Sequence, residues 1–178
     1  MIKTLAASSF LMVAASAAVA QDIGPAAEKP GLDYAFSARV ELFDPIEQGT
    51  VNGLRMRFVP ISGGTVSGPK LTGKVLPGGG DWQSISPDGL TDVTALYSLQ
   101  AEDGTVIAIR NTGVRTASAE VTKRMAAGED VSPDDYYMRT SARFTVEAGP
   151  HDWMNRTMFV VRGIRRPDHV VMDFYEVK

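Results

Sequence analysis

Residues 92–110 read DVTALYSLQAEDGTVIAIR and carry the clearest indication of how this chain folds. Apolar and polar side chains alternate along the first half of this stretch, which is typical of a strand with one buried face. The apolar face consists of Val93, Ala95, Tyr97 and Leu99. Glu102-Asp103-Gly104 then forms a tight turn, and residues 105–110 continue in an extended pattern. The stretch therefore predicts a β-hairpin.

The same alternation recurs along the chain. It is visible from Phe36 to Leu42, at Phe144 and Val146, and from Val170 to Val177. Residues 158–161 are continuously apolar, which predicts a strand covered on both sides. Short segments of this kind are separated by Gly, Pro and Asp, so we expect about nine strands.

One stretch, residues 118–127, predicts a helix. Ser118 is suited to cap its first turn, Glu120 lies in that turn, and Gly128 follows its last residue. Many short strands with a single short helix predict an all-β domain, either a sandwich or an antiparallel barrel of about eight to ten strands. We favour the barrel because closure removes exposed strand edges and because the strand faces carry many polar residues.

The N-terminus predicts an exported protein. Lys3 precedes an uncharged apolar run from Leu5 to Val19, and Ala18-Val19-Ala20 offers small residues for cleavage between Ala20 and Gln21. We therefore expect residues 1–20 to be a signal peptide, residues 21–31 a flexible tether and residues 32–178 the folded domain. The apolar run is short for a membrane span, so no stable membrane insertion is expected after cleavage, and the location would be the periplasm or the exterior.

The composition narrows the function further. Loss of residues 1–20 removes Lys3 alone among the charged residues, which leaves 17 Lys and Arg against 21 Asp and Glu and a net charge of −4. That balance argues against nucleic acid as a partner. The chain has no cysteine, so its stability must come from the core rather than from disulfides.

The most distinctive block runs from Gly63 to Trp82. Its density of glycine indicates bulges, bends or close approaches of backbone within a sheet. The sequence here resembles the bacterial family filed as domain of unknown function 3237. The resemblance rests on an ordered set of short motifs: Gly53-Leu54-Arg55, Gly63-Gly64, Gly68-Pro69, Leu71, Gly73, Pro77-Gly78-Gly79-Gly80-Asp81-Trp82, Asp88-Gly89, Tyr97, Leu99, Asp103-Gly104, Gly113, Tyr136-Tyr137-Met138-Arg139, Phe144, Trp153-Met154-Asn155 and Tyr175. It implies a compact antiparallel β-barrel and no established activity.

Four residues are candidates for ligand binding or catalysis: Asp81, Trp82, Arg139 and Arg55. Asp81 and Trp82 follow three glycines, and they would either present a carboxylate and an indole to a cavity or serve a turn and the core. Arg139, at the start of a strand, would bind an anionic ligand or pair with Asp81 or Asp92. Arg55 carries the same ambiguity.

A second group of candidates would form an aromatic pocket. Trp153 and Asn155 would share one face of a strand, and with Tyr97 they would offer aromatic walls and one amide. The alternative is core packing, with Asn155 tied to backbone. His151, Asp152 and His169 match no metal-site spacing, so no metal is expected.

The function that we predict is binding of a small, partly aromatic or anionic molecule inside the barrel, through Arg55, Trp82, Tyr97, Arg139, Trp153 and Asn155. One alternative is a cofactor-free lyase, isomerase or hydrolase with Asp81 as acid or base and Arg139 as charge stabiliser. Another is a structural module of the envelope with a filled barrel. No cofactor is expected in any of these cases.

Overall fold

The computed structural model describes residues 28–178, so the predicted signal peptide and most of the predicted tether lie outside the described residues. Residues 28–31 are exposed and precede the first strand. The elements in chain order are β1 (Leu32–Leu42), β2 (Ile46–Val51), β3 (Leu54–Ser67), β4 (Gly73–Val75), β5 (Gly80–Ile85), β6 (Leu90–Ala101), β7 (Val106–Ala117), α1 (Ala119–Ala126), β8 (Tyr136–Thr145), the 3-10 helix η1 (Asp152–Arg156), β9 (Phe159–Arg165) and β10 (His169–Val177).

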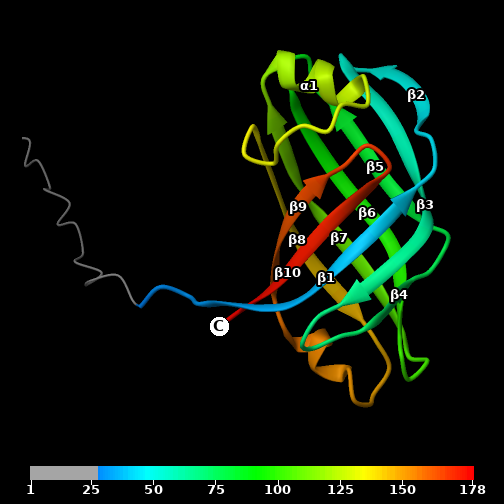
Figure 1. Ribbon diagram of the computed structural model, residues 1–178, viewed down its shortest axis with the longest axis vertical. Coiled ribbons are helices and arrows are strands. Elements are labelled where there is room, and N and C mark those ends of the chain that lie inside the picture. The colour runs from blue at the N-terminus through cyan, green and yellow to red at the C-terminus, as the bar shows by residue number, and fades with distance from the viewer. Residues whose placement is uncertain (1–27) are drawn as a thin grey trace, which may run out of the picture.

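The strands of residues 28–178 form a closed antiparallel barrel, as the alternation predicted (Figure 1). Neighbours around the barrel follow the order β1, β10, β9, β8, β7, β6, then β4 and β5, then β3, which returns to β1. The short strands β4 and β5 both lie between β3 and β6, so the ring has eight strand positions. Strand β2 is an extra strand that pairs with β3 beyond the ring.

The hairpin predicted from residues 92–110 is confirmed. Strands β6 and β7 pair along almost their whole length, and the amide of Gly104 donates to the carbonyl of Ala101 in the turn between them. The helix is confirmed as well, because α1 begins after Ser118, whose hydroxyl accepts from the amide of Val121.

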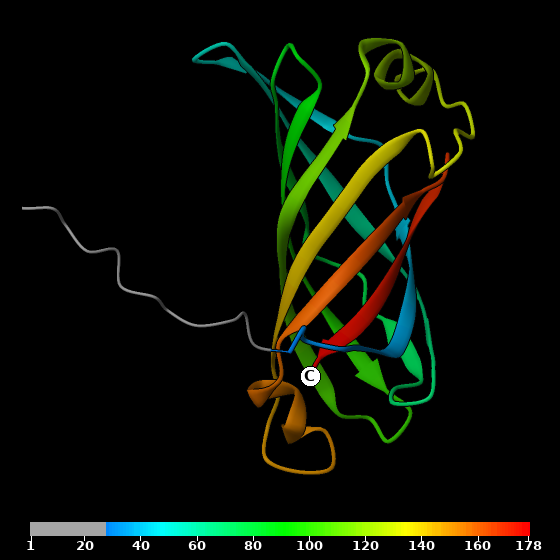
Figure 2. The same cartoon turned by 90° about the vertical axis from the view of Figure 1, so that its left-hand side faces the viewer.

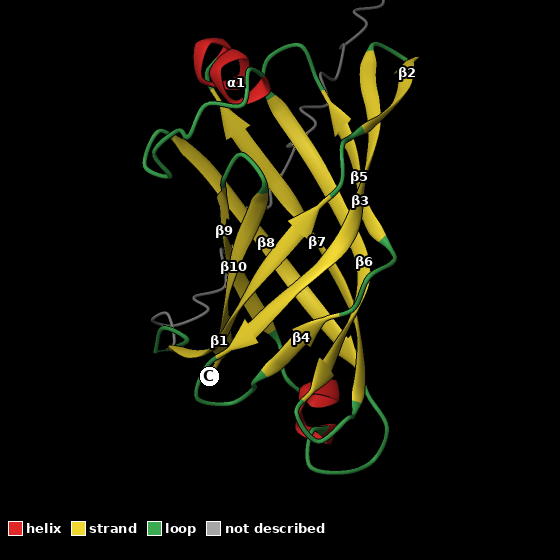
Figure 3. Cartoon of the chain, turned by 45° about the vertical axis from the view of Figure 1, so that its right-hand side comes forward, coloured by secondary structure: helices red, strands yellow, loops and turns green. Residues whose placement is uncertain are grey.

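Different elements lie at the two ends of the barrel (Figure 3). Helix α1 and the β2–β3 hairpin extend beyond one end, and η1 lies at the other (Figure 2). Among the described residues, no helix is long and apolar enough to cross a bilayer.

The aromatic part of the core fills the barrel near η1. Four phenylalanines pack there, and the stacked rings of Phe36 and Phe174 have centroids 4.6 Å apart. Phe144 packs edge-on against Phe159 at 5.0 Å, and the buried Met154 of η1 belongs to the same cluster.

Residues 158–161 depart from the prediction. Phe159 and Val161 are buried, but Met158 and Val160 are exposed. The expectation of a strand covered on both faces was wrong because the outer face of β9 meets solvent, as the outer wall of a single barrel does.

Candidate functional site

A cavity of about 350 Å³ occupies the part of the barrel interior farther from the phenylalanine cluster. Inward side chains from β1, β3 and from β5 to β10 line it. The loop after β1 and the turn between β9 and β10 bound it at one end, through Phe43 and Arg166 among others. The apolar walls are formed by Val40, Val59, Ile61, Val93, Ala95, Met138 and Met172. The polar lining consists of Arg57, Asp81, Gln83, Tyr97, Asn111, Arg115, Thr140 and Arg165.

Asp81 is placed in the cavity by the start of β5. The preceding Gly79 has a φ of 72°, and a Cβ there would lie 2.1 Å from the carbonyl oxygen of Leu96, so only glycine fits the path into the strand. Because side chains alternate along a strand, Asp81 and Gln83 point inward and Trp82 points outward.

A short hydrogen-bonded chain fixes the Asp81 carboxylate. The side-chain amide of Gln83 donates to Asp81 Oδ2, and Gln83 Oε1 accepts from Arg57 Nε at 2.7 Å. Burial disfavours the charged carboxylate and raises the pKa of Asp81 to about 6, although Gln83, Arg57 and Arg115 partly oppose that rise. Asp81 therefore changes its protonation state close to neutral pH.

Three arginines also face the cavity: Arg57, Arg115 and Arg165. Arg115 is 7% exposed, and burial lowers its pKa to about 10. Burial lowers the pKa of Arg57 and of Arg165 too. Arg115 Nη2 donates to the buried hydroxyl of Thr91 at 3.3 Å. None of the three is in an ion pair with a carboxylate of residues 28–178, so their positive charge has no direct counterion in this part of the chain.

Polar atoms without a hydrogen-bond partner gather at this cavity. Within the described chain, five buried side-chain nitrogen or oxygen atoms lack a partner, and all five belong to residues that line it. They are Asp81 Oδ1, Tyr97 Oη, Asn111 Oδ1, Thr140 Oγ1 and Arg165 Nη1. Unsatisfied buried polar groups are costly, so their concentration in one cavity points to a site built for a polar ligand.

Two of the residues singled out in the sequence share this cavity, Asp81 and Tyr97. Tyr97 is buried, and its burial beside Asp81 raises the pKa of the phenol.

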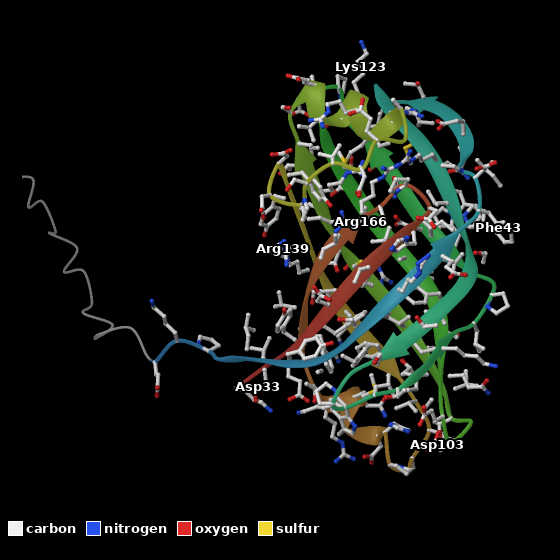
Figure 4. The ribbon with its side chains drawn as sticks, in the orientation of Figure 1. Asp33, Phe43, Asp103, Lys123, Arg139 and Arg166 are labelled. Carbon is white, nitrogen blue, oxygen red and sulfur yellow. The ribbon has the colours of Figure 1, made fainter. Side chains whose placement is uncertain are left out.

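Trp82, Arg139 and Arg55 lie elsewhere. Trp82 is 41% exposed on the outer face and packs on Phe58, with ring centroids 4.6 Å apart. Arg139 also lies on the outer face, because its neighbours Met138 and Thr140 point inward (Figure 4).

The contacts of the two arginines agree with these positions. Arg139 donates to the carbonyl of Met138 at 2.8 Å and lies over the ring of Tyr137, so it forms no pair with Asp81 or Asp92. Arg55 is exposed beyond the ring of strands and pairs with Glu47 of β2 at 2.5 Å.

Trp153 and Asn155 lie at the opposite end of the barrel, in η1 rather than on a strand as expected. The amide of Asn155 holds the backbone of Val146 through two hydrogen bonds, of 3.0 Å to its N–H and 2.9 Å to its carbonyl. Trp153 packs on Phe159 under the ammonium group of Lys70. Both residues therefore close the filled end of the barrel.

Most of the polar lining was missed in the sequence. Arg57, Gln83, Asn111, Arg115 and Thr140 were not singled out there. A signal was present for Asn111 and Arg115, because they continue the inward face of Ile107 and Ile109 along β7. On a strand, every second residue faces the core, and polar residues at those positions are the pattern that would have identified them.

The two histidines lie outside the cavity lining. His151 contacts Asp103 at 3.0 Å, and His169 contacts Asp168 at 2.7 Å. Between residues 28 and 178 no group of three or more His, Cys, Asp or Glu side chains is arranged to hold a metal ion.

Comparisons with known proteins agree with the barrel. Residues 30–177 match the family model described as protein of unknown function (DUF3237). A UPF0311 protein of Clostridium acetobutylicum is 39% identical over 123 residues, which cover 69% of this chain and 78% of that protein. A solved structure of a conserved protein of unknown function from Rhodopseudomonas palustris superposes with a TM-score of 0.80 at 31% identity, over 86% of this chain and all of the other. The structure of an enzyme from Penicillium herquei has a TM-score of 0.66 at 17% identity, over 88% of this chain and all of the other, and this likeness concerns the fold alone.

Proposed function

This chain belongs to the DUF3237 family, and we propose that it binds a small anionic molecule in the barrel cavity. The observation that carries the proposal is the set of three inward arginines without a carboxylate counterion among residues 28–178. Burying a charge is expensive unless an opposite charge or several hydrogen bonds compensate. An anionic ligand would supply that compensation, and the apolar walls would bury the rest of the molecule.

The cavity also favours ligand binding over the role of a structural envelope module, because such a module would need no interior space. A volume of about 350 Å³ is within the range of small-molecule sites. Small-molecule sites typically have apolar walls and a few polar groups that point into the cavity.

Native mass spectrometry of the full chain purified from its own host tests the proposal. We expect a bound small acid that is released on denaturation. Arg115→Met should abolish the bound mass, whereas Arg110→Met, on the exposed face of the same strand, should retain it. A wild-type chain that carries no ligand and binds no small acid added to it would contradict the proposal.

A second candidate function is cofactor-free catalysis with Asp81 as acid or base. The pKa of about 6 favours it, since a group that titrates near neutral pH both takes up and releases protons efficiently. Arg115 and Arg57 would then stabilise developing negative charge, in the role first expected of Arg139. With the bound molecule as substrate, Asp81→Asn should stop turnover but not binding, and a rate that is unchanged in this variant would exclude Asp81.

The N-terminal sequence supports a further part of the proposal, export of the mature chain. Fractionation of host cells, followed by N-terminal sequencing, should find a chain that begins near Gln21 outside the cytoplasm. A chain that keeps residues 1–20 in the cytoplasm would contradict export.

A further inference from the structure

The unpartnered polar atoms of the cavity fall into two chemical classes. Asp81 Oδ1 and Asn111 Oδ1 accept hydrogen bonds, whereas Arg165 Nη1 only donates. The hydroxyls of Tyr97 and Thr140 serve either role. A simple anion would satisfy the donors and leave the two acceptors without partners. A complementary ligand therefore needs a hydrogen-bond donor as well as a negative charge.

The two acceptors flank one small residue. Asp81 of β5 pairs with Ala95 of β6, and Ala95 pairs with Asn111 of β7, so the three residues form a row across adjacent strands. Strands are about 4.8 Å apart, which places the backbones of Asp81 and Asn111 about 10 Å apart. The methyl group of Ala95 leaves space between them, and Tyr97 lies two residues further along the same face. A hydroxyl group of a ligand fits this row.

The donors that carry charge lie toward the bounded end of the cavity. Arg115 is on the same face of β7 as Asn111 and four residues beyond it, which corresponds to about 13 Å along the strand. Arg165 ends β9, directly before the turn that bounds the cavity. The positive charges of Arg57 and Arg165 both act on Arg115, so the three guanidinium groups form one positive region, and the charge of Asp81 at the other pole acts on Arg115 in the opposite sense. The cavity thus has a cationic pole at Arg115 and Arg165 and an acceptor pole at Asp81 and Asn111.

Building on the binding function proposed above, we propose that the ligand is a small hydroxylated carboxylic acid. Its carboxylate contacts Arg115 and Arg165, and its hydroxyl group donates to Asp81 or Asn111. The part between the two poles is apolar or aromatic, because Val93, Met138 and Met172 line the cavity.

Titration calorimetry of the full chain at pH 7.5 tests this assignment with four probes: 3-hydroxybenzoate, 4-hydroxybenzoate, benzoate and phenol. At least one hydroxybenzoate should bind about tenfold or more tightly than both benzoate and phenol, since a hydrogen bond to a charged or buried group is worth a factor of that order. Asn111→Leu should reduce the ratio of hydroxybenzoate affinity to benzoate affinity. Arg165→Met should weaken the binding of all three acids and leave the binding of phenol unchanged, whereas Arg162→Met, on the outer face of β9, should change neither.

Failure of the hydroxylated-acid ligand can be distinguished from failure of anion binding, the function on which it rests. Equal affinity of the hydroxybenzoates and benzoate for the wild-type chain would overturn the hydroxyl assignment and leave anion binding standing. Phenol bound as tightly as the acids would overturn the carboxylate assignment. No binding of any probe would overturn the ligand class, while the bound mass in protein from the host would still decide the proposed function. These comparisons use the wild-type chain, so they hold even where a variant fails to fold.

Discussion

The barrel interior has two regions made from the same strands, and they are built in opposite ways. Near η1, the inward side chains are aromatic and apolar, and they fill the space around Phe36, Phe144, Phe159 and Phe174. In the other region the same alternation places arginine, asparagine and aspartate inward, around a cavity. Strand β7 passes through both regions, from Ile107 and Ile109 to Asn111 and Arg115. The comparison indicates that the filled region stabilises the fold, while the cavity carries polar groups that the fold alone does not need.

The largest effect is expected from a change in the filled region. Phe174→Ala removes a fully buried ring that stacks on Phe36, and large-to-small changes of this kind cost about 3–5 kcal/mol. Chemical denaturation should show this loss in the free energy of unfolding. Val160→Ala, on the exposed face of β9, is the control and should cost less than about 0.5 kcal/mol. A small loss for Phe174→Ala would mean that the phenylalanine cluster is not the main source of stability.

In the cavity, the pH dependence of Asp81→Asn should reveal the cost of a buried charge. The pKa of Asp81 is raised from 3.8 to about 6 on folding, so the folded chain keeps a proton that the unfolded chain releases between these values. Ionisation of Asp81 therefore lowers stability as the pH rises toward and through 6, and a pKa difference of this size corresponds to about 3 kcal/mol. The free energy of unfolding of Asp81→Asn, relative to wild type, should rise by that amount between pH 3 and pH 8.

The matched control for this measurement is Asp92→Asn, on the exposed face of β6. Because Asp92 is exposed, this change controls for the loss of a carboxylate as such. A pH-independent difference for Asp81→Asn would show that Asp81 is not desolvated in the folded chain.

Arg115→Met should stabilise the chain in the absence of ligand. A buried charge without a counterion is costly, and Arg115 has no ion-pair partner to lose within residues 28–178, so an apolar side chain should more than offset the lost hydrogen bond to Thr91. We expect a gain of about 1–2 kcal/mol in thermal or chemical unfolding, together with the loss of ligand. Arg110→Met should change neither quantity. A clear loss of stability in Arg115→Met would assign this arginine to the fold rather than to a ligand.

The smallest effect is expected outside both regions. Removal of residues 1–30 should leave the melting temperature almost unchanged, because residues 28–30 are exposed. The backbone contact next to this cut, from the amide of Lys178 to the carbonyl of Gly31, is retained in the shortened chain. A large drop would show that the preceding residues pack on the barrel and would revise the predicted domain boundary.

The sequence predicted the barrel well because its evidence is local. Alternation along Phe36 to Leu42 and the turn at Asp103-Gly104 depend on neighbouring residues, and the motif order identified the family. The predicted inward face of β6, which includes Tyr97, also agrees with the structure.

The candidate site was less accessible to sequence reasoning, because it depends on which face of each strand points inward and on register between distant strands. Arg139 and Trp82 were expected near Asp81, but each lies one position away from an inward residue and so faces outward. Trp153 and Asn155 follow an irregular loop, where alternation carries no information. Arg165 reaches the cavity only through the pairing of β9 with β8 and β10, which no local pattern records.

The contact between Gln83 and Arg57 has a consequence for where a proton can reside. The guanidinium Nε of Arg57 can only donate, so it holds Gln83 with the oxygen toward Arg57 and the NH₂ toward Asp81. That NH₂ donates a hydrogen bond to Asp81 Oδ2, whereas Oδ1 has no hydrogen-bond partner in the cavity. Oδ1 is therefore the oxygen that binds the proton near pH 6. The acid form of Asp81 thus presents its O–H toward the cavity, and an arginine that never touches the carboxylate sets that direction.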